Sequence, residues 1–324
     1  MLKKCYKINV DKLKICYRQP QELWENVSQF NNGDIINYDC FYLQILDNGK
    51  ANKESEKPST KIIANCVCDD GTLMGTFTFH NSAKYEGLCF FEFANSALYT
   101  VAGYNQGKKY NYICYMEYVE GVLGLVKNNI TTLEIAVDTN FNPLITFYKL
   151  LKNSNEYDLI VNGKKVNEAT EIIANYGEYF ERSRTKRKRF PTVYVSQKKD
   201  NSPQLKIYDK KQEIIENNKE YISEWNEFKG NTMYRTEITV KNEDFKQFQH
   251  LAEEYINEWN DLERVLALLS DDEYKLLLWN YITHRMLYFS PKKRNCDAIT
   301  MRTLTVDECQ VKKTLTHTIA TKSI

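Results

Sequence analysis

The sequence of 324 residues lacks several features that would assign it to a class of protein at once. No segment approaches about 18 consecutive apolar residues, and residues 1–5 carry no apolar signal core, so we expect a cytoplasmic protein with no membrane partner. The nine cysteines are scattered and odd in number, which favours free thiols in a reducing compartment over a disulfide framework. Cys66 and Cys68 are close together, but no second pair or nearby histidine completes a zinc site.

Histidine is also scarce, and the four copies, at positions 80, 250, 284 and 317, lie far apart in the sequence. Any metal site must therefore use carboxylates, and the His-x-x-Arg element of a tyrosine recombinase is missing. Residues 103–109 contain glycines and lysines, but their spacing is one residue short of a phosphate-binding loop, and Lys109 replaces its serine or threonine. Helicase activity would have to come from a partner.

The composition is that of a folded globular protein, with 42% hydrophobic and 27% charged residues. The formal net charge of +1 argues at first against a nucleic-acid partner, but the charge is unevenly distributed. Residues 182–211 contain eleven basic and two acidic residues, so this segment carries +9 and the rest of the chain −8. A basic run is often a solvated loop, but this one leads into two predicted strands with tyrosines, a mixture typical of phosphate contacts and base stacking. The candidate DNA-binding residues are Lys186, Arg187, Lys188, Arg189, Tyr194, Lys198 and Lys199.

The hydrophobic pattern predicts an α+β fold, a mainly antiparallel sheet flanked by helices, with a C-terminal α-helical region. Alternating segments predict strands at 12–17, 35–46, 61–68, 72–80, 88–94, 131–138, 192–196, 204–210 and 232–240, and a hairpin at 157–166. Helical spacing predicts helices after Pro20 and at 112–127, 143–152, 168–181, 211–228 and 242–289. We therefore divide the chain into an α+β domain (1–241), a helical region for DNA binding or dimerisation (242–290) and a polar tail (291–324).

Two carboxylates share one face of the predicted strand at 131–138. Glu134 and Asp138 alternate with apolar residues, so both acids point the same way. Such a pair needs a basic side chain or a hard divalent metal, which prefers carboxylate oxygens; exposed acids on a solvated face are the alternative. Glu237 is a third candidate ligand, and it shares a strand face with Arg235, with which it could form an ordinary ion pair.

A tyrosine lies between two lysines on one face of the predicted strand at 204–210. The side chains of Lys206, Tyr208 and Lys210 alternate with their neighbours, and the two ammonium groups would favour the phenolate and hold phosphate oxygens. Most of the 23 tyrosines must be structural, but Tyr208 has two lysines on its own face and a basic approach.

In order and spacing, these motifs resemble the replication initiation factors of rolling-circle plasmids of the Rep-trans type, to which relaxases of some conjugative elements are related. The resemblance covers roughly residues 10–245 and rests on Asp11–Ile15, Phe90–Phe93 followed by Asn95 and Tyr99, Glu134–Asp138, Thr192–Ser196, Lys206–Lys210 and Arg235–Glu237. The chain departs from the usual pattern at Glu134, Thr132, Lys206 and Ser196, where aspartate, arginine, arginine and glycine are common in the family.

The resemblance implies a metal-dependent enzyme that nicks and rejoins DNA, with residues 1–241 as its catalytic domain. Tyr208 would be the nucleophile and would stay linked to the 5′ phosphate, while a 3′ hydroxyl is released for a polymerase. Glu134, Asp138 and Glu237 would hold Mg²⁺ or Mn²⁺, and Lys206, Lys210 and Arg235 would clamp phosphate oxygens. Tyr208 must then lie within a few ångströms of Glu134 and Asp138, on adjacent strands.

The partners implied are origin DNA, with a hairpin that presents the nick site unpaired, and the polymerase and helicase of a bacterial host. The resemblance also suggests a homodimer and a gene carried by a plasmid or phage. Two alternatives remain open. A relaxase for conjugative transfer or mobilisation would use the same residues, and a non-catalytic DNA-binding regulator would use its acids only to pair with lysines.

Overall fold

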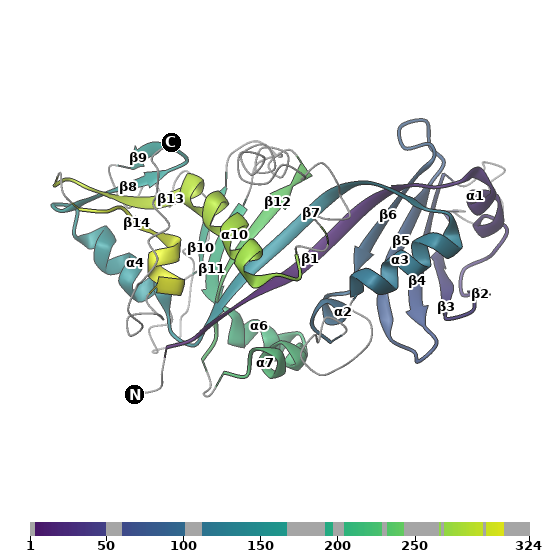
Figure 1. Ribbon diagram of the computed structural model, residues 1–324, viewed down its shortest axis with the longest axis horizontal. Helices are drawn as coiled ribbons and strands as arrows, with labels where there is room; N and C mark the ends of the chain where they lie inside the picture. Colours follow the sequence, from purple (N-terminus) through teal and green to yellow (C-terminus); the bar gives the residue numbers. More distant parts are fainter. Residues whose placement is uncertain are drawn as a thin grey trace.

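A computed structural model describes residues 4–49, 60–100, 112–166, 192–196, 204–228, 232–242, 266, 269–293 and 296–307. The strands of its main sheet are β1 (Tyr6–Arg18), β2 (Ile35–Asn37), β3 (Phe41–Asp47), β4 (Lys61–Cys68), β5 (Leu73–His80), β6 (Leu88–Phe93), β7 (Val126–Thr139), β10 (Val193–Ser196), β11 (Gln204–Asp209) and β12 (Tyr234–Lys241). These ten strands form one antiparallel sheet in the order β10-β11-β12-β7-β1-β6-β5-β4-β3-β2 (Figure 1). The predicted α+β class is confirmed.

The two longest strands, β1 and β7, lie side by side in the middle of this sheet. They have 13 and 14 residues and pair along their whole length, from Tyr6 opposite Thr139 to Arg18 opposite Val126. Their register shifts between Val10 and Lys12, which is the signature of a β-bulge at Asp11. The bulge turns Asp11 and Lys12 toward the same face, and two further register shifts follow, between Lys14 and Ile15 and between Cys16 and Tyr17.

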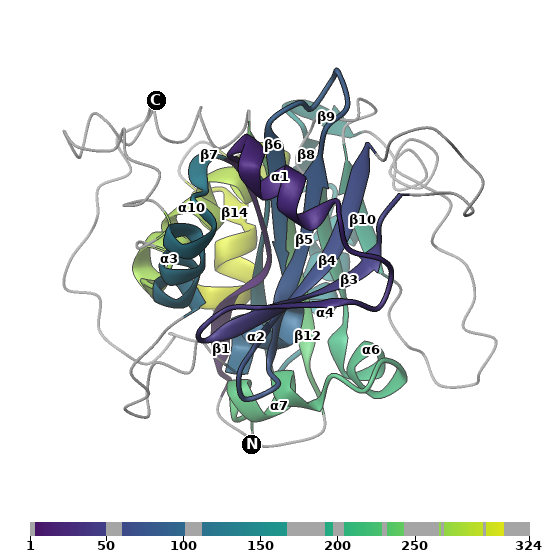
Figure 2. The ribbon, with the colours of Figure 1, turned by 90° about the vertical axis from the view of Figure 1, so that its right-hand side faces the viewer.

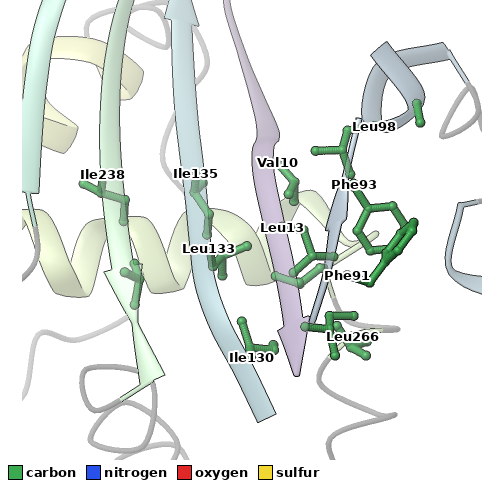
Figure 3. Close-up of a cluster of buried hydrophobic side chains, with 14 of the residues drawn as sticks. Val10, Leu13, Phe91, Phe93, Leu98, Ile130, Leu133, Ile135, Ile238 and Leu266 are labelled. Atoms are coloured by element: carbon green, nitrogen blue, oxygen red, sulfur yellow. The ribbon is translucent and has the colours of Figure 1, made fainter. Parts of the chain in front are cut away.

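Two of the helices cover one face of the sheet. The α-helices are α1 (Gln21–Val27), α2 (Asn95–Thr100), α3 (Tyr112–Leu123), α4 (Pro143–Lys152), α6 (Lys210–Glu216), α7 (Glu220–Asn226) and α10 (Asp272–Met286). Figures 1 and 2 show α3 and α10 on the same side of the sheet, and α10 packs on β1, β7 and β12. Apolar side chains of these strands, among them Leu13, Leu133 and Ile238, gather on that side and are fully buried (Figure 3). The residues that alternate with them therefore face the other side.

Local sequence explains several of these elements. Asn142 caps α4 by accepting a hydrogen bond from the backbone N–H of Leu144, and Pro143 occupies the first turn. Asp209 caps α6 in the same way through the N–H of Lys211, so the helix begins directly after β11. The predicted hairpins at 157–166 and 192–210 are also present, the first of them as β8 (Tyr157–Val161) and β9 (Lys164–Val166).

The C-terminal part differs from the expectation. The sheet structure does not end before residue 242, because β13 (Leu287–Pro291) follows α10 directly and pairs with β8. Together with β14 (Ile299–Thr300) these strands form a second sheet in the order β14-β13-β8-β9. The predicted polar tail contains a π-helix, η2 (Thr303–Asp307), whose Leu304 and Val306 are buried. The helical stretch predicted at 168–181 lies outside the described residues, as does most of 242–268.

The predicted helix 211–228 is two helices. Asn218, with φ of +53°, adopts the left-handed conformation between α6 and α7, and this conformation ends a helix. The break lets α7 turn toward the sheet, where its residues Trp225 and Asn226 contact Asn9 of β1.

Two further observations concern the described part of the chain. None of the eight cysteines described there forms a disulfide bond. No helix described by the structure is long and apolar enough to span a bilayer.

Candidate active site

The chemistry-bearing residues of three neighbouring strands meet on the sheet face opposite α10. Glu134 on β7 lies opposite Thr239 of β12, and Glu237 of β12 lies opposite Lys206 of β11. Because side chains alternate along a strand, these residues and Tyr208 of β11 point to one side. Tyr208 and Glu134 are not on adjacent strands as expected, since β12 lies between β11 and β7.

Three carboxylates form an acidic cluster: Asp11 of β1, Glu134 of β7 and Glu237 of β12. One oxygen of each lies within 4.8 Å of those of the others. The bulge at Asp11 delivers the first carboxylate, since regular pairing would place one residue there rather than two. Sequence analysis did not select Asp11 as a ligand, although the break in alternation between Asp11 and Lys12 is a signal for it.

The hydroxyl of Tyr208 is attached to this cluster. It donates a hydrogen bond to Glu237 Oε2 at 3.0 Å, and Lys210 Nζ lies 3.4 Å from the same hydroxyl oxygen. Burial and the negative charges of Glu237 and Glu213 raise the pKa of Tyr208, although the charge of Arg235 opposes this. The phenol is therefore protonated in the free protein, and its proton points at a carboxylate.

Lys210 is a buried cation, with 1% of its surface exposed. Its ammonium group binds Glu213 Oε2 at 2.9 Å, and Glu213 also binds Lys219 at 3.2 Å. Burial and the nearby charge of Arg235 lower the pKa of Lys210. Glu213 was missed by sequence analysis because it lies on α6, whose position beside Tyr208 depends on where β11 ends.

Glu134 is the carboxylate of the cluster with no ion pair to any residue that the structure describes. Its Oε1 accepts a hydrogen bond from Thr239 at 3.2 Å, whereas Glu237 is held by Lys206 Nζ at 3.0 Å and Asp11 by Arg235. Burial and the negative charge of Glu237 raise the pKa of Glu134. An additional cation at this point would relieve the repulsion among the three acids.

Arg235 and Asp138 were expected to contact phosphate and metal, but in the structure they bind each other in the interior. Both are completely buried, and Arg235 binds Asp138 through two hydrogen bonds, Nε to Oδ1 at 2.6 Å and Nη2 to Oδ2 at 2.7 Å. Arg235 Nη1 also binds Asp11, and Nη2 donates to the hydroxyl of Tyr99 on α2 at 2.9 Å. This geometry speaks against Asp138 as a metal ligand and against Arg235 as a phosphate clamp, because the oxygens and N–H groups concerned already bind each other.

The network behind the cluster includes the helices. Asn226 of α7 donates to Asp138 Oδ2 at 2.9 Å, and the indole of Trp225 donates to Asn9 at 2.6 Å. The charge of Arg235, with that of Lys210, holds the pKa of Asp11 well below its usual range despite burial, which acts in the opposite direction. Asp11 is thus ionised at neutral pH and is held in place by Arg235.

The acidic cluster and Tyr208 open into one cavity of about 420 Å³, the size of a small-ligand site. Its lining residues are Asp11, Glu134, Thr192, Tyr194, Lys206, Tyr208, Glu213, Lys219 and Glu237. Tyr194 of β10 is 39% exposed and lies opposite Lys206, so it stands at the rim. The other predicted DNA-binding residues, Lys186, Arg187, Lys188, Arg189, Lys198 and Lys199, lie outside the described residues.

Comparisons with known proteins give limited relationships. No protein-family profile matches the sequence. No curated protein matches it. Among solved structures, a rolling circle replication initiator protein from Geobacillus stearothermophilus is similar, with 12% sequence identity and a TM-score of 0.43; the alignment covers 95% of this chain and 96% of that one.

Proposed function

We propose that this protein is a rolling-circle replication initiator that nicks and rejoins DNA at an origin, with Tyr208 as the nucleophile. One observation carries the proposal: the Tyr208 hydroxyl donates to Glu237 at 3.0 Å, and Glu237 belongs to a cluster of three carboxylates in the same cavity. A nucleophile hydrogen-bonded to a base, with the base held by a further group, is the arrangement that activates a hydroxyl. Here Lys206 holds Glu237 from the other side.

The chain's own residues supply a complete transesterification. Glu237 takes the phenolic proton as the Tyr208 oxygen attacks phosphorus, and the bond from phosphorus to the 3′ oxygen breaks. The products are a phosphotyrosine on the 5′ end and a 3′ hydroxyl, whose oxygen takes up one proton in exchange for the one that Glu237 received from Tyr208. Lys210 lies against the Tyr208 oxygen and offsets its negative charge as the proton leaves.

The covalent intermediate preserves the energy of the broken phosphodiester. The joining step is therefore the reverse displacement, in which a 3′ hydroxyl attacks the phosphotyrosine and no nucleoside triphosphate is needed. This agrees with the lack of a phosphate-binding loop in the sequence.

A divalent metal fits the cluster by the chemistry of its donors. Hard cations such as Mg²⁺ and Mn²⁺ prefer carboxylate oxygens, and Asp11, Glu134 and Glu237 offer three within 4.8 Å of one another. Neither Asp11 Oδ2 nor Glu134 Oε2 accepts a hydrogen bond from a residue within the described ranges. When bound, the metal would polarise the scissile phosphate and neutralise developing charge.

The test is a nicking assay on supercoiled plasmid that carries a rolling-circle origin, with Mg²⁺ or Mn²⁺. We expect the wild type to give relaxed DNA and a covalent adduct, and Tyr208→Phe to bind the DNA but form no adduct. Tyr118→Phe is the matched control, because this tyrosine is exposed on α3 and does not line the cavity. Its adduct should persist.

Three outcomes would contradict the proposal or redirect it. An undiminished adduct in Tyr208→Phe would exclude this residue as the nucleophile. Binding by the wild type without metal-dependent cleavage would favour a DNA-binding regulator. Cleavage at a transfer origin in preference to a replication origin would favour a relaxase.

A further inference from the structure

The face of the main sheet that carries the acidic cluster continues beyond the cavity onto β1, β6, β5 and β4. We propose that this face is a platform for single-stranded DNA, which holds the strand that leads to Tyr208. The inference rests on the proposed function, since it assigns a second binding surface to the same substrate. It adds a site that the cavity residues do not include.

The strand register sets the residues of this face in rows. Lys14 lies opposite Glu92, which lies opposite Thr76, which lies opposite Asn65. In the next row, Phe90 lies opposite Thr78. The residues on either side of Phe90 in sequence, Cys89 and Phe91, are completely buried on the helix-covered face, so Phe90 points the other way and is half-buried.

An aromatic group lies on this surface, beside the turn that joins β5 and β6. The ring of Phe90 makes edge contacts with those of His80 and Tyr85, with centroids 5.5 Å and 5.9 Å apart. Burial and the charges of Lys61 and Lys14 lower the pKa of His80, so this ring is a neutral aromatic at neutral pH. Open sheets that bind single strands stack bases on such rings, because every base has a π face.

The charges around the rings complement a phosphate backbone. Lys14 lies over the ring of Phe90 at 5.7 Å and Lys84 over that of Tyr85 at 5.0 Å. Lys12 and Lys14 share one acid, Glu92, at 2.8 Å and 3.5 Å, which leaves a positive excess on β1. Lysines beside aromatic rings are what a single strand requires, since phosphates and bases alternate along it.

The platform is continuous with the catalytic cavity. Lys12 lies opposite Glu134 of the acidic cluster, and Cys16, four residues farther along β1, lies opposite Phe90. Four residues of a strand span about 13 Å, the length of roughly four stacked nucleotides at about 3.4 Å each. A strand that stacks on Phe90 would therefore reach the cavity within a few nucleotides.

The experiment measures binding of a fluorescein-labelled oligodeoxythymidine by fluorescence anisotropy, in EDTA and over a range of salt concentrations. Phe90→Leu should weaken binding about tenfold with an unchanged salt dependence, because stacking is lost and no charge changes. Lys14→Gln should instead reduce the slope of log K against log salt by about 0.7, the value for one phosphate contact on a single strand. Tyr85→Leu, in the loop beside β6, is a second aromatic variant in case Phe90→Leu unfolds.

Matched controls lie elsewhere on the molecule. Tyr118→Leu removes a 40% exposed aromatic from α3, and Lys149→Gln removes an exposed lysine from α4. Neither should alter affinity or slope. The proposal would be overturned if the control variants lost as much affinity as Phe90→Leu, or if both aromatic variants bound as the wild type does. It would also be overturned if Phe90→Leu weakened binding to a duplex of the same length equally, or if the wild type preferred oligouridine.

Failure of this proposal is distinguishable from failure of the proposed function. The binding assay contains no metal and requires no cleavage, so it does not depend on Tyr208 being the nucleophile. If nicking is absent but Phe90→Leu weakens binding, the platform belongs to a DNA-binding protein. If nicking proceeds and the variants bind normally, the strand reaches Tyr208 by another surface.

Discussion

Replacement of Arg235 by methionine separates a structural role of this residue from a phosphate clamp. Arg235 is 0% exposed, and its guanidinium makes two hydrogen bonds to Asp138, one to Asp11 and one to Tyr99. Methionine would fill much of the space but leave two carboxylates without their cation. Breaking a buried ion pair costs about 3–5 kcal/mol of folding free energy. Because this variant leaves two acids without their cation, we expect a cost at the upper end of this range, about 5 kcal/mol. For a chain of this size we expect the melting temperature to fall by about 7 °C.

Urea unfolding of a double-mutant cycle measures this cost. The single variants Arg235→Met and Asp138→Leu should each destabilise, whereas the double variant should cost less than their sum, because it removes both charges of the pair. The pH dependence gives a second reading. The pKa of Asp11 is lowered, against the effect of burial, by Arg235 and Lys210, so Asp11 contributes stability above about pH 4 that is lost as the pH falls through its folded value. Arg235→Met should lose part of this acid-sensitive stability.

A different result would refute the reasoning. If Arg235→Met costs under about 1 kcal/mol and still abolishes nicking, the guanidinium is free to act on substrate, and the buried network is not what holds it. Additive single variants, with a coupling below about 0.5 kcal/mol, would show that Arg235 and Asp138 do not depend on each other.

Three further predictions concern single residues. Lys210→Met should keep the fold, because Glu213 is partly exposed and keeps its ion pair with Lys219, but it should slow adduct formation by about 10²–10³-fold in a single-turnover assay; an unchanged rate would mean that Lys210 does not stabilise the Tyr208 oxygen. Glu134→Gln should raise the melting temperature at pH 7, because burial and Glu237 raise the pKa of Glu134 and its ionised form is costly; the gain should vanish below about pH 4, and added Mn²⁺ should stabilise the wild type but not the variant. Gly75→Ala should cost about 1–3 kcal/mol in urea unfolding, since a Cβ would clash with the Glu92 carbonyl and lie 2.5 Å from the Phe91 ring, whereas Gly121→Ala on α3 meets no atom within 4 Å and should stabilise slightly.

The strand pattern of the main sheet could be predicted because its two sides differ so clearly. Segments such as 131–138 alternate strictly, and each became a strand whose apolar side chains face the helices. The hairpin β8–β9 was also predicted, but β13, which joins it to form the second sheet, was missed for the opposite reason. Leu287 and Phe289 continue an apolar pattern that also suits the preceding helix, and a five-residue strand carries too few positions to separate the two periods.

Partner choice within the site could not be read from the sequence. Alternation placed Glu134 and Asp138 on one face of β7, and Arg235 and Glu237 on one face of β12, but four charges allow more than one pairing. The register decides it: Arg235 lies opposite Asp138, whereas Glu237 lies opposite Ala136, and so remains available to Tyr208 and Lys206. A register is set by long-range pairing, which local periodicity does not contain.

The split of charges along these strands explains how a near-neutral protein can hold a reactive site. At the end covered by α2 and α7, Arg235 is matched by Asp138 and Asp11, so this end is rigid and electrically satisfied. Farther along the strands, at the cavity, burial and the negative charge of Glu237 raise the pKa of Glu134, so its ionised form is unfavourable. Glu134 also lacks an ion pair with any described side chain. The unfavourable energy is thus concentrated at one carboxylate beside the proposed nucleophile. A divalent cation bound there would gain most at the position where the phosphate must be neutralised, which makes Glu134, rather than the better-paired acids, the residue on which metal affinity should depend most steeply.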